Sequence, residues 1–301
     1  MKKKTKKIFI ILLSIVVILC GAIYLGYEYI DNINYVKLKE SSEELKVSES
    51  TSEKSKKAGI ENILLLGVDK QENASDSIMV LTIDKTHNKL KLSSIMRDTR
   101  IYLGDDKVNK INYAYHYGGP AKTISVINEE FDLDIQKYAL ISFEGLINVI
   151  DYFDGVELEI TQAERDYLKN LPKANSNGLV TLNGSQALAY SRIRYIDSDS
   201  VRTSRQRNVI MSLFNKVRGV SITEIPKLIS DISSNVETNL SLSEIVNIAN
   251  TVITMDVSNI EDFRIPIDNT IEHTFERGVY ILGWNKDINV DALHDFIYGT
   301  V

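Results

Sequence analysis

Short apolar segments alternate with helix-like segments from residue 60 onwards, and this alternation limits the chain to a mixed α/β fold. The segments with the composition of buried strands are residues 60–69, 77–84, 90–96, 137–143 and 155–160. The segments with a helical pattern are residues 118–131, 144–153, 183–192, 222–235 and 241–255, and residues 262–284 are rich in strand-forming side chains. We therefore predict one α/β domain over residues 60–301, with a central mixed sheet flanked by helices.

The N-terminus has the pattern of a membrane anchor. The segment from Ile8 to Tyr27 carries no charge and is long enough to cross a hydrocarbon core of roughly 30 Å. Five lysines precede it and favour a cytoplasmic position for that end. We expect a cytoplasmic tail over residues 1–7, one transmembrane helix over residues 8–30, and an extracytoplasmic domain. A cleaved signal peptide is the alternative, and it would export the domain equally.

The single cysteine, Cys20, lies inside the apolar segment, so the exported part has no disulfide. A cysteine-poor exterior suits a bacterial cell envelope. Residues 31–59 are rich in serine, lysine and glutamate. Because such a composition does not offset the entropy of ordering, we expect a flexible stalk there. A short helix over residues 35–45 is the alternative.

Carboxylates and arginines are the candidate functional groups. The sequence has no Walker A loop, no GxSxG or HExxH motif, and no metal-ligand spacing among its four histidines. Asp69 ends the first predicted strand and Asp76 opens the next, so the short loop between them would bring the two carboxylates together. Two close carboxylates repel unless they share a cation, and oxygen ligands of this kind suit Mg²⁺ or Mn²⁺. Otherwise each aspartate would simply cap a turn.

Five of the eleven arginines lie within residues 192–207, although the chain has a net charge of −6. In the segment SRIRY, Arg192 and Arg194 alternate with Ile193, so an extended backbone would place both guanidinium groups on one side. Two arginines on one side can grip the oxygens of an anion.

A helix that starts near Arg202 follows, and its periodicity separates the remaining arginines. Arg202 and Gln206 lie within about 20° of its apolar stripe and should point inward. Arg205 lies at the edge of the stripe, whereas Arg207 lies about 120° away and should be solvated. The helix N-terminus favours a bound phosphate. A solvated basic face is the alternative, but inward arginines without an anion would be unstable, so we predict an anion-binding pocket.

These blocks together resemble the LytR-CpsA-Psr family. The resemblance rests on NILLLGVD, the acid of DSIMVLTID, SSIMRDTRIYL, KINYAYHYGGP and LNGSQALAYSRIRYIDSDSVRTSRQRNVI, in this order and spacing. It implies an envelope phosphotransferase. Such enzymes move a glycopolymer (teichoic acid, capsule or a related anionic polysaccharide) from undecaprenyl pyrophosphate to peptidoglycan through a phosphodiester.

The resemblance also implies roles for individual residues, carried over by position. The implied metal ligands are Asp69 and Asp76. The implied pyrophosphate-binding residues are Arg97, Lys110, Arg192, Arg194, Arg202 and Gln206. The implied catalytic residues are Asp76, Arg97, Arg192, Arg194 and Asp199, with Asp76 or Asp199 as the base. Many members carry an arginine two residues before the second acid, where this chain has Ala74, and this difference removes one phosphate contact.

Two other functions would use the same residues. One is hydrolysis of a lipid pyrophosphate by water, and the other is binding of an envelope polyanion without catalysis. A nucleic-acid regulator is disfavoured, because the domain is expected outside the membrane, the net charge is negative and aromatic residues are not interleaved with the arginines. We expect no nucleic-acid partner.

Overall fold

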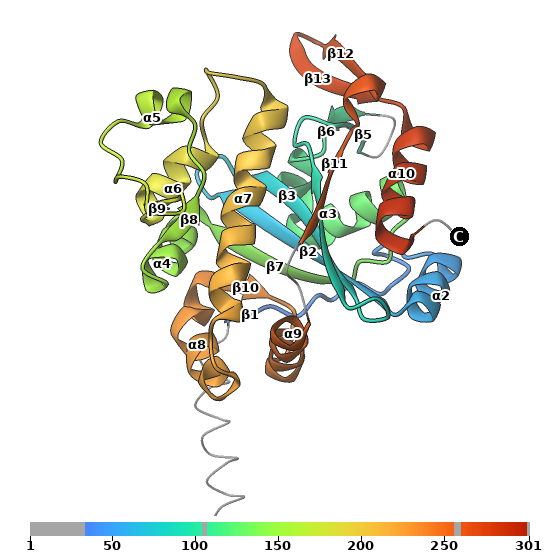
Figure 1. The fold of residues 1–301 in the computed structure, drawn as a ribbon. Helices are drawn as coiled ribbons and strands as arrows, with labels where there is room; N and C mark the ends of the chain where they lie inside the picture. Colours follow the sequence, from blue (N-terminus) through green and yellow to red (C-terminus); the bar gives the residue numbers. More distant parts are fainter. Residues whose placement is uncertain (1–33, 104–106, 256–259, 300–301) are drawn as a thin grey trace, which may run out of the picture.

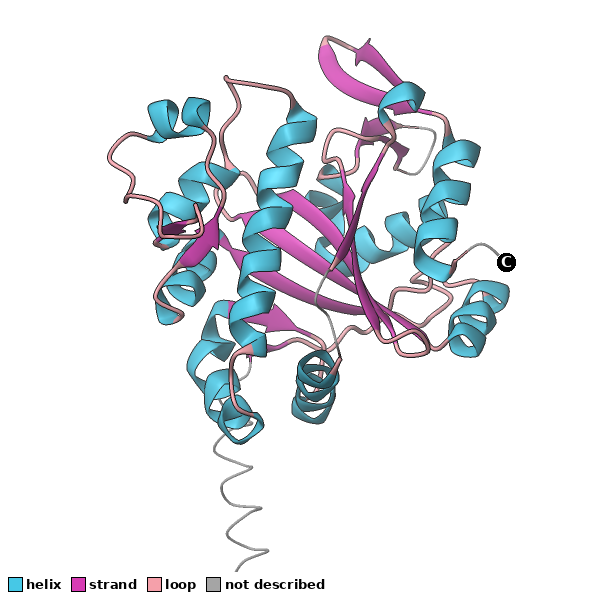
Figure 2. Cartoon of the chain, in the orientation of Figure 1, coloured by secondary structure: helices cyan, strands magenta, loops and turns pink. Residues whose placement is uncertain are grey.

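A computed structural model describes residues 34–103, 107–255 and 260–299 (Figures 1 and 2). Within these residues, the central sheet has seven strands in the order β1-β10-β7-β2-β3-β4-β11. In that order they span Asn34–Tyr35, Val236–Thr238, Lys137–Ser142, Ile60–Asp69, Ala74–Asp84, Lys89–Ile95 and Glu261–Ile265. The strands β2, β3 and β4 form an antiparallel meander, whereas β7 pairs with β2 and β11 with β4 in parallel. The predicted mixed sheet is therefore confirmed.

Helices cover both faces of the sheet. Side chains of β2 alternate between two apolar clusters, with Leu64 packed toward α3 (Tyr113–Phe131) and α10 (Lys286–Tyr298). The neighbouring Ile63 packs instead toward α7 (Asp199–Arg218) and α9 (Leu242–Thr254). Figure 1 shows α7 crossing one face of the sheet as a long diagonal helix. Because both faces are buried, the central strands have nearly continuous apolar sequences.

Smaller elements surround this core. The two-stranded sheets are β5–β6 (Arg100–Tyr102 and Val108–Lys110), β8–β9 (Val156–Leu158 and Val180–Leu182) and β12–β13 (Ile271–Glu276 and Val279–Trp284). The remaining α-helices are α2 (Glu49–Ala58), α4 (Phe143–Tyr152), α5 (Gln162–Leu168), α6 (Gly184–Ser191) and α8 (Ile225–Ile232). Short 3₁₀ turns at Ile222–Glu224 and Ser233–Asn235 flank α8, so the helix predicted over residues 222–235 is divided into three pieces.

Helix α3 starts earlier than its sequence pattern indicates. It begins at Tyr113, and Gly118 and Gly119 interrupt it, the second with φ +60°. Pro120 then restarts the helix, as proline suits a first helical turn. The prediction of a helix opened by the Gly-Gly-Pro sequence is confirmed, and an additional turn precedes it.

The prediction of a flexible stalk is wrong for residues 34–59. Strand β1 extends the sheet beside β10, and Leu45 is buried in the core. Helix α2 runs from a Ser48 N-cap to Gly59, which adopts φ +70°. Residues 36–47 form only coil and turn, so the alternative helix over residues 35–45 is also wrong. Thr51 donates a hydrogen bond of 2.7 Å to Asp132, which caps the C-terminal end of α3. A few well-placed apolar side chains and polar contacts therefore order a segment whose average composition is that of a linker.

The predicted tail and anchor over residues 1–30 lie outside the described residues. Across the described ranges, no helix combines the length and apolarity needed to span a membrane.

Candidate active site

The β2–β3 hairpin gathers three carboxylates. Asp69 pairs with Ala74 at the end of the hairpin, and a bulge beside Gly67 shifts the register just before the turn. Carboxylate oxygens of Asp69, Glu72 and Asp76 lie within 4.8 Å of one another. The hairpin thus brings together the two predicted acids. Glu72 was not predicted as a metal ligand. No distinctive spacing in the sequence marks it, and it joins the two aspartates only through its position in the turn.

Asp69 also stabilises the turn itself. Its Oδ1 accepts hydrogen bonds from the backbone N–H of Gln71 at 2.8 Å and of Glu72 at 3.4 Å. The capping role considered as an alternative is therefore present as well. Asp76 instead forms an ion pair with Arg97, which follows β4.

Arg97 lies between the partly buried Asp76 and the buried Asp98. Its Nε is 3.7 Å from Asp98 Oδ2 and has no hydrogen-bond acceptor among the described residues. Burial would lower the pKa of Arg97, but the charges of Asp76 and Asp98 outweigh it and raise the pKa. On the far side of Asp98, Lys110 of β6 places its Nζ 2.7 Å from Oδ1. Burial would raise the pKa of Asp98, but Lys110 and Arg97 lower it, so this acid is ionised at neutral pH.

Arg192 and Arg194 do not lie on a strand. Helix α6 continues to Ser191, Arg192 is its C-cap, and the following residues form a loop. The predicted extended segment is therefore wrong, because the chain leaves α6 through a turn at Arg192 and forms no strand after it. The alternation of sides nevertheless persists: Ile193 is fully buried, while both arginines are exposed and line the same cavity. Arg192 also lies over the ring of Phe143, 4.5 Å from its centroid.

Helix α7 begins at Asp199, three residues before the predicted start at Arg202. Ser198 caps it by accepting a hydrogen bond from the backbone N–H of Val201. Arg202 is 5% exposed and forms an ion pair of 2.9 Å with Asp199. Burial, followed by the nearby charges of Arg97 and Arg194, lowers the pKa of Arg202. Three guanidinium groups from separate segments therefore converge closely enough to repel one another, and a bound anion would offset this repulsion.

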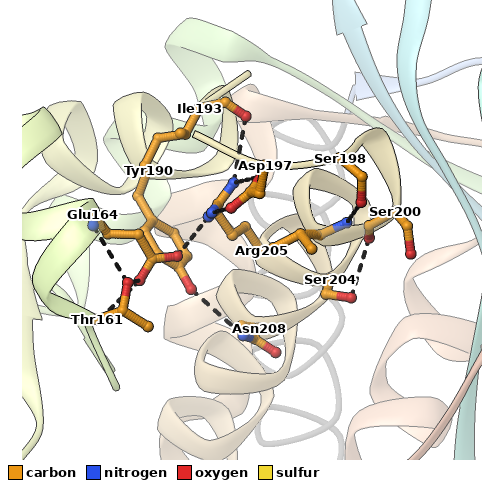
Figure 3. A network of polar contacts seen from close by, with 11 residues as sticks. Thr161, Glu164, Tyr190, Ile193, Asp197, Ser198, Ser200, Ser204, Arg205 and Asn208 are labelled. Atoms are coloured by element: carbon orange, nitrogen blue, oxygen red, sulfur yellow. Dashed lines mark hydrogen bonds and ion pairs between the residues drawn. The ribbon is translucent and has the colours of Figure 1, made fainter. Parts of the chain in front are cut away.

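Gln206 and Arg205 lie on different sides of α7. The amide of Gln206 donates a hydrogen bond of 3.4 Å to the Asp76 carbonyl, so it faces the predicted site. Arg205 is not marginal, as the periodicity predicted, but 2% exposed. Figure 3 shows its side chain between Asp197 and Glu164. Arg205 forms an ion pair of 2.6 Å with Glu164 and another with Asp197, and these contacts hold the loop that carries Arg194.

The prediction that Arg207 is solvated is wrong. Its side chain is 9% exposed and forms an ion pair of 2.8 Å with Asp262 of β11. It also donates a hydrogen bond of 3.3 Å to the hydroxyl of Ser94 on β4. Arg207 is buried because the sheet edge packs against the flank of α7, which one helix's periodicity cannot reveal. It lines neither of the two cavities described below.

An inner cavity lies between the sheet and helices α4, α6 and α7. It encloses about 190 Å³. Its walls are mostly apolar and include Leu65, Met79, Ile141, Leu146, Leu188 and Val209. Its polar residues are Asp76, Arg97, Arg192, Arg194, Arg202 and Gln206, together with three serines. The structure thus brings most of the predicted pyrophosphate-binding residues to one apolar cavity.

An outer cavity lies on the other side of the arginines. It is lined by Arg97, Arg194 and Arg202, which also line the inner cavity, and by Asp98, Lys110 and Asp199. The hairpin β12–β13 contributes His273, Tyr280 and Leu282 to its wall. Lys110 and Asp199 therefore belong to the outer side of the arginine cluster, whereas Asp76 belongs to the inner side.

Comparison with known proteins identifies the family of this chain. Residues 28–292 match the LytR_cpsA_psr family. A relative from Bacillus cereus (strain AH820) is the polyisoprenyl-teichoic acid–peptidoglycan teichoic acid transferase TagU. It is 33% identical over 279 residues, covering 87% of this chain and 88% of the relative.

Solved structures have the same fold. The crystal structure of B. subtilis TagV has a TM-score of 0.65 and 25% identity, covering 80% of this chain and 98% of that one. A structure of TagT bound to LIIa-WTA has a TM-score of 0.66 and 24% identity, covering 80% of this chain and 91% of that one. With its family motifs gathered around one cationic cavity mouth, the chain belongs to the LytR_cpsA_psr family.

Proposed function

We propose that this protein transfers a glycopolymer from a polyprenyl-pyrophosphate carrier to peptidoglycan, forming a phosphodiester. The observation that carries the proposal is the inner cavity, whose apolar walls end at a mouth of arginines. A polyprenyl pyrophosphate has the same division, since its tail is apolar and its head carries negative charge. The name of the related TagU, a polyisoprenyl-teichoic acid–peptidoglycan teichoic acid transferase, supports this assignment.

The head group would lie among Arg97, Arg194 and Arg202, with Arg192 and Gln206 at the edge of the cavity. Guanidinium groups bind phosphate oxygens through paired, charge-assisted hydrogen bonds. Burial, and after it the charges of Arg97 and Arg194, lower the pKa of Arg202, and this anion would offset both effects. Phosphoryl transfer depends mainly on such positioning and charge stabilisation.

The reaction proceeds by displacement at the phosphorus on the polymer side. A peptidoglycan hydroxyl oxygen forms the new bond to this phosphorus, the bridging P–O bond breaks, and polyprenyl phosphate leaves with the bond's electron pair. The hydroxyl proton passes to a carboxylate. We assign this role to Asp199 rather than Asp76, because Asp199 lines the outer cavity whereas Asp76 lines the inner one.

The three hairpin carboxylates fit a divalent metal ion. Asp69, Glu72 and Asp76 offer oxygen ligands within 4.8 Å of one another, which suits Mg²⁺ and also Mn²⁺. Asp76 would contact both the cation and Arg97. A bound Mg²⁺ would add positive charge next to the transferring phosphoryl group.

Metal binding is testable without turnover. In the full chain, Asp69→Asn should weaken Mn²⁺ binding, followed by electron paramagnetic resonance, at least about tenfold, because a charged ligand is lost. Glu53→Gln changes an exposed acid on α2 and is the matched control. Equal Mn²⁺ affinity in wild type and Asp69→Asn would show that Asp69 only caps the turn.

We further propose that the protein is anchored in a bacterial cell membrane with its N-terminus in the cytoplasm and its domain outside. The uncharged segment from Ile8 to Tyr27 and the lysines before it support this position. Teichoic acid, capsule and related anionic polysaccharides are the candidate polymers, and all would present the same lipid pyrophosphate to the cavity.

The decisive experiment is reconstitution. The full chain is incubated with Mg²⁺, a polyprenyl-pyrophosphate-linked glycan and a peptidoglycan oligomer, and the products are identified by mass spectrometry. A phosphodiester-linked adduct is expected. Free glycan phosphate without adduct would instead identify a lipid-pyrophosphate hydrolase, and binding without any product would identify a polyanion-binding module.

A further inference from the structure

The outer cavity borders a group of aromatic side chains that have no role in the proposed displacement at phosphorus. His273 and Tyr280 of the hairpin β12–β13 have ring centroids 5.9 Å apart and planes inclined by 25°. His273 Nδ1 and the Tyr280 hydroxyl lie 2.7 Å apart. Phe275 meets Tyr280 edge to face at 5.7 Å, yet remains 71% exposed. We call these three side chains the aromatic platform.

The aromatic platform is fixed relative to the arginine cluster. The backbone N–H of Leu282 donates a hydrogen bond of 2.8 Å to the carbonyl of Asp98, next to Arg97. The Trp284 indole donates another of 2.8 Å to the carbonyl of Arg100. Lys110 Nζ lies 5.8 Å from the centroid of the Tyr280 ring. Figure 1 shows the hairpin at the same end of the molecule as the start of α7.

The direction of the reaction identifies which substrate would lie against the platform. In phosphoryl transfer the attacking and leaving oxygens are roughly in line on opposite sides of the phosphorus. The lipid phosphate leaves toward the inner, apolar cavity, so the attacking hydroxyl must enter from the opposite side. The outer cavity shares Arg97, Arg194 and Arg202 with the inner one and is otherwise lined by different residues, so it offers a separate approach to a head group held by these arginines. The polymer stays bonded to the phosphorus and extends sideways, out of this line.

The side chains of the outer cavity suit a sugar. An aromatic ring offers an apolar face with a polar edge, which matches the C–H face and hydroxyl rim of a pyranose. Asp199, Ser198 and Ser200 add hydrogen-bonding groups opposite the platform. Burial, followed by the charges of Asp98 and Asp199, raises the pKa of Tyr280, so its hydroxyl stays protonated and can donate to a sugar oxygen.

We propose that the outer cavity binds the acceptor glycan and that Tyr280, with His273 and Phe275, forms its sugar-binding platform. The inference rests on the proposed transferase function. In this arrangement the platform positions a sugar of the acceptor strand, so that its hydroxyl approaches the phosphorus from the side opposite the lipid phosphate. Tyr280 is a positioning residue and takes no part in proton transfer.

The test is a kinetic separation of the two substrates in the full chain. With the lipid-linked donor saturating, Tyr280→Leu should raise the KM for a peptidoglycan oligomer about tenfold, whereas Tyr280→Phe keeps the ring and should cost much less. The donor KM, and hydrolysis of the donor by water without acceptor, should not change. Tyr167→Leu alters an exposed tyrosine on α5 and is the matched control.

Phe275→Ala, at a largely exposed position, supplies a second variant if Tyr280→Leu does not fold, and it too should raise the acceptor KM. An unchanged acceptor KM in the folded variants would overturn the inference. A rise in the donor KM instead would show that the platform holds the donor's own sugar, which also overturns it. If wild type forms no adduct, the proposed transfer fails, and calorimetric binding of the peptidoglycan oligomer to wild type and Tyr280→Leu still tests the platform.

Discussion

Arg205 and Arg207 lie two residues apart on α7, yet their side chains serve different parts of the fold. Arg205 is enclosed by Glu164 and Asp197 and holds the loop before α7. Arg207 reaches Asp262 on the edge strand of the sheet. By contrast, Arg194 is exposed at the cavity and has no carboxylate within ion-pair distance among the described residues. Arg205 and Arg207, whose carboxylate partners line neither cavity, therefore stabilise the fold, whereas Arg194 remains available to a ligand.

A comparison of two substitutions separates these roles. Arg194→Gln should lower the transfer rate by about 100-fold, because a cationic contact to the transition state is lost. Its free energy of unfolding should stay within about 0.5 kcal/mol of wild type, since the side chain is exposed. Initial rates and urea unfolding measure the two quantities.

Arg207→Gln should show the converse. Loss of the buried guanidinium leaves Ser94 and Asp262 without their partner and should lower the free energy of unfolding by roughly 1–3 kcal/mol. The transfer rate of the folded protein should stay within about twofold of wild type. Equal losses of activity in the two variants would contradict the division between ligand-binding and structural arginines.

At the scale of secondary-structure elements, the segment before β2 is part of the domain. Strand β1 pairs with β10, and α2 packs on the side of the sheet that α3 and α10 cover. The sequence did not indicate that this segment is folded, because only a few apolar side chains are spread over it. Its contacts to residues far along the chain, such as Asp132, become apparent only in the folded molecule.

Leu45 tests whether this segment is structural. The side chain is 3% exposed, so Leu45→Ala should lower the free energy of unfolding by about 2–5 kcal/mol. Val36→Ala, at a position 41% exposed beside β1, should change it by no more than about 0.5 kcal/mol. Urea unfolding of both variants provides the measurement, and equal small effects would restore the interpretation of a stalk.

At the scale of the whole molecule, ion pairs between distant segments make stability depend on pH. Glu244 of α9 lies 2.5 Å from Lys137 of β7. Burial would raise the pKa of Glu244, but Lys137 and Ser241 outweigh it and lower the pKa from 4.5 to about 2. A carboxylate with a depressed pKa stabilises the fold above pH 4.5, and this contribution is lost as the pH falls toward 2.

Glu244→Gln isolates this contribution, because glutamine preserves the capping box at the start of α9 while removing the charge. At pH 7 the variant should be less stable by no more than about 1 kcal/mol, since the pair is partly exposed to solvent. The difference should vanish near pH 2, as measured by urea unfolding across this range. No difference at any pH would show that Glu244 acts only as a cap.

The sequence by itself determined the fold class, the central strands and the set of candidate residues. Apolar periodicity is a local property of buried strands, so β2, β3, β4 and β7 could be predicted from it. The proximity of the hairpin acids could also be predicted, because only a short loop separates Asp69 and Asp76 in the sequence. The prediction of which arginines are solvated was wrong where the partner of a side chain comes from another element, as Asp262 does for Arg207.

Only the tertiary structure decided how these residues divide into an inner and an outer side. Arg97 follows β4, Arg194 lies in the loop after α6, and Arg202 lies in the first turn of α7. Their convergence depends on how three distant segments cross at one end of the sheet, and so do the apolar walls beneath them. Local sequence patterns specify which faces of an element are buried, but not which other element covers each face. The cavities and the aromatic platform depend on which element covers each face.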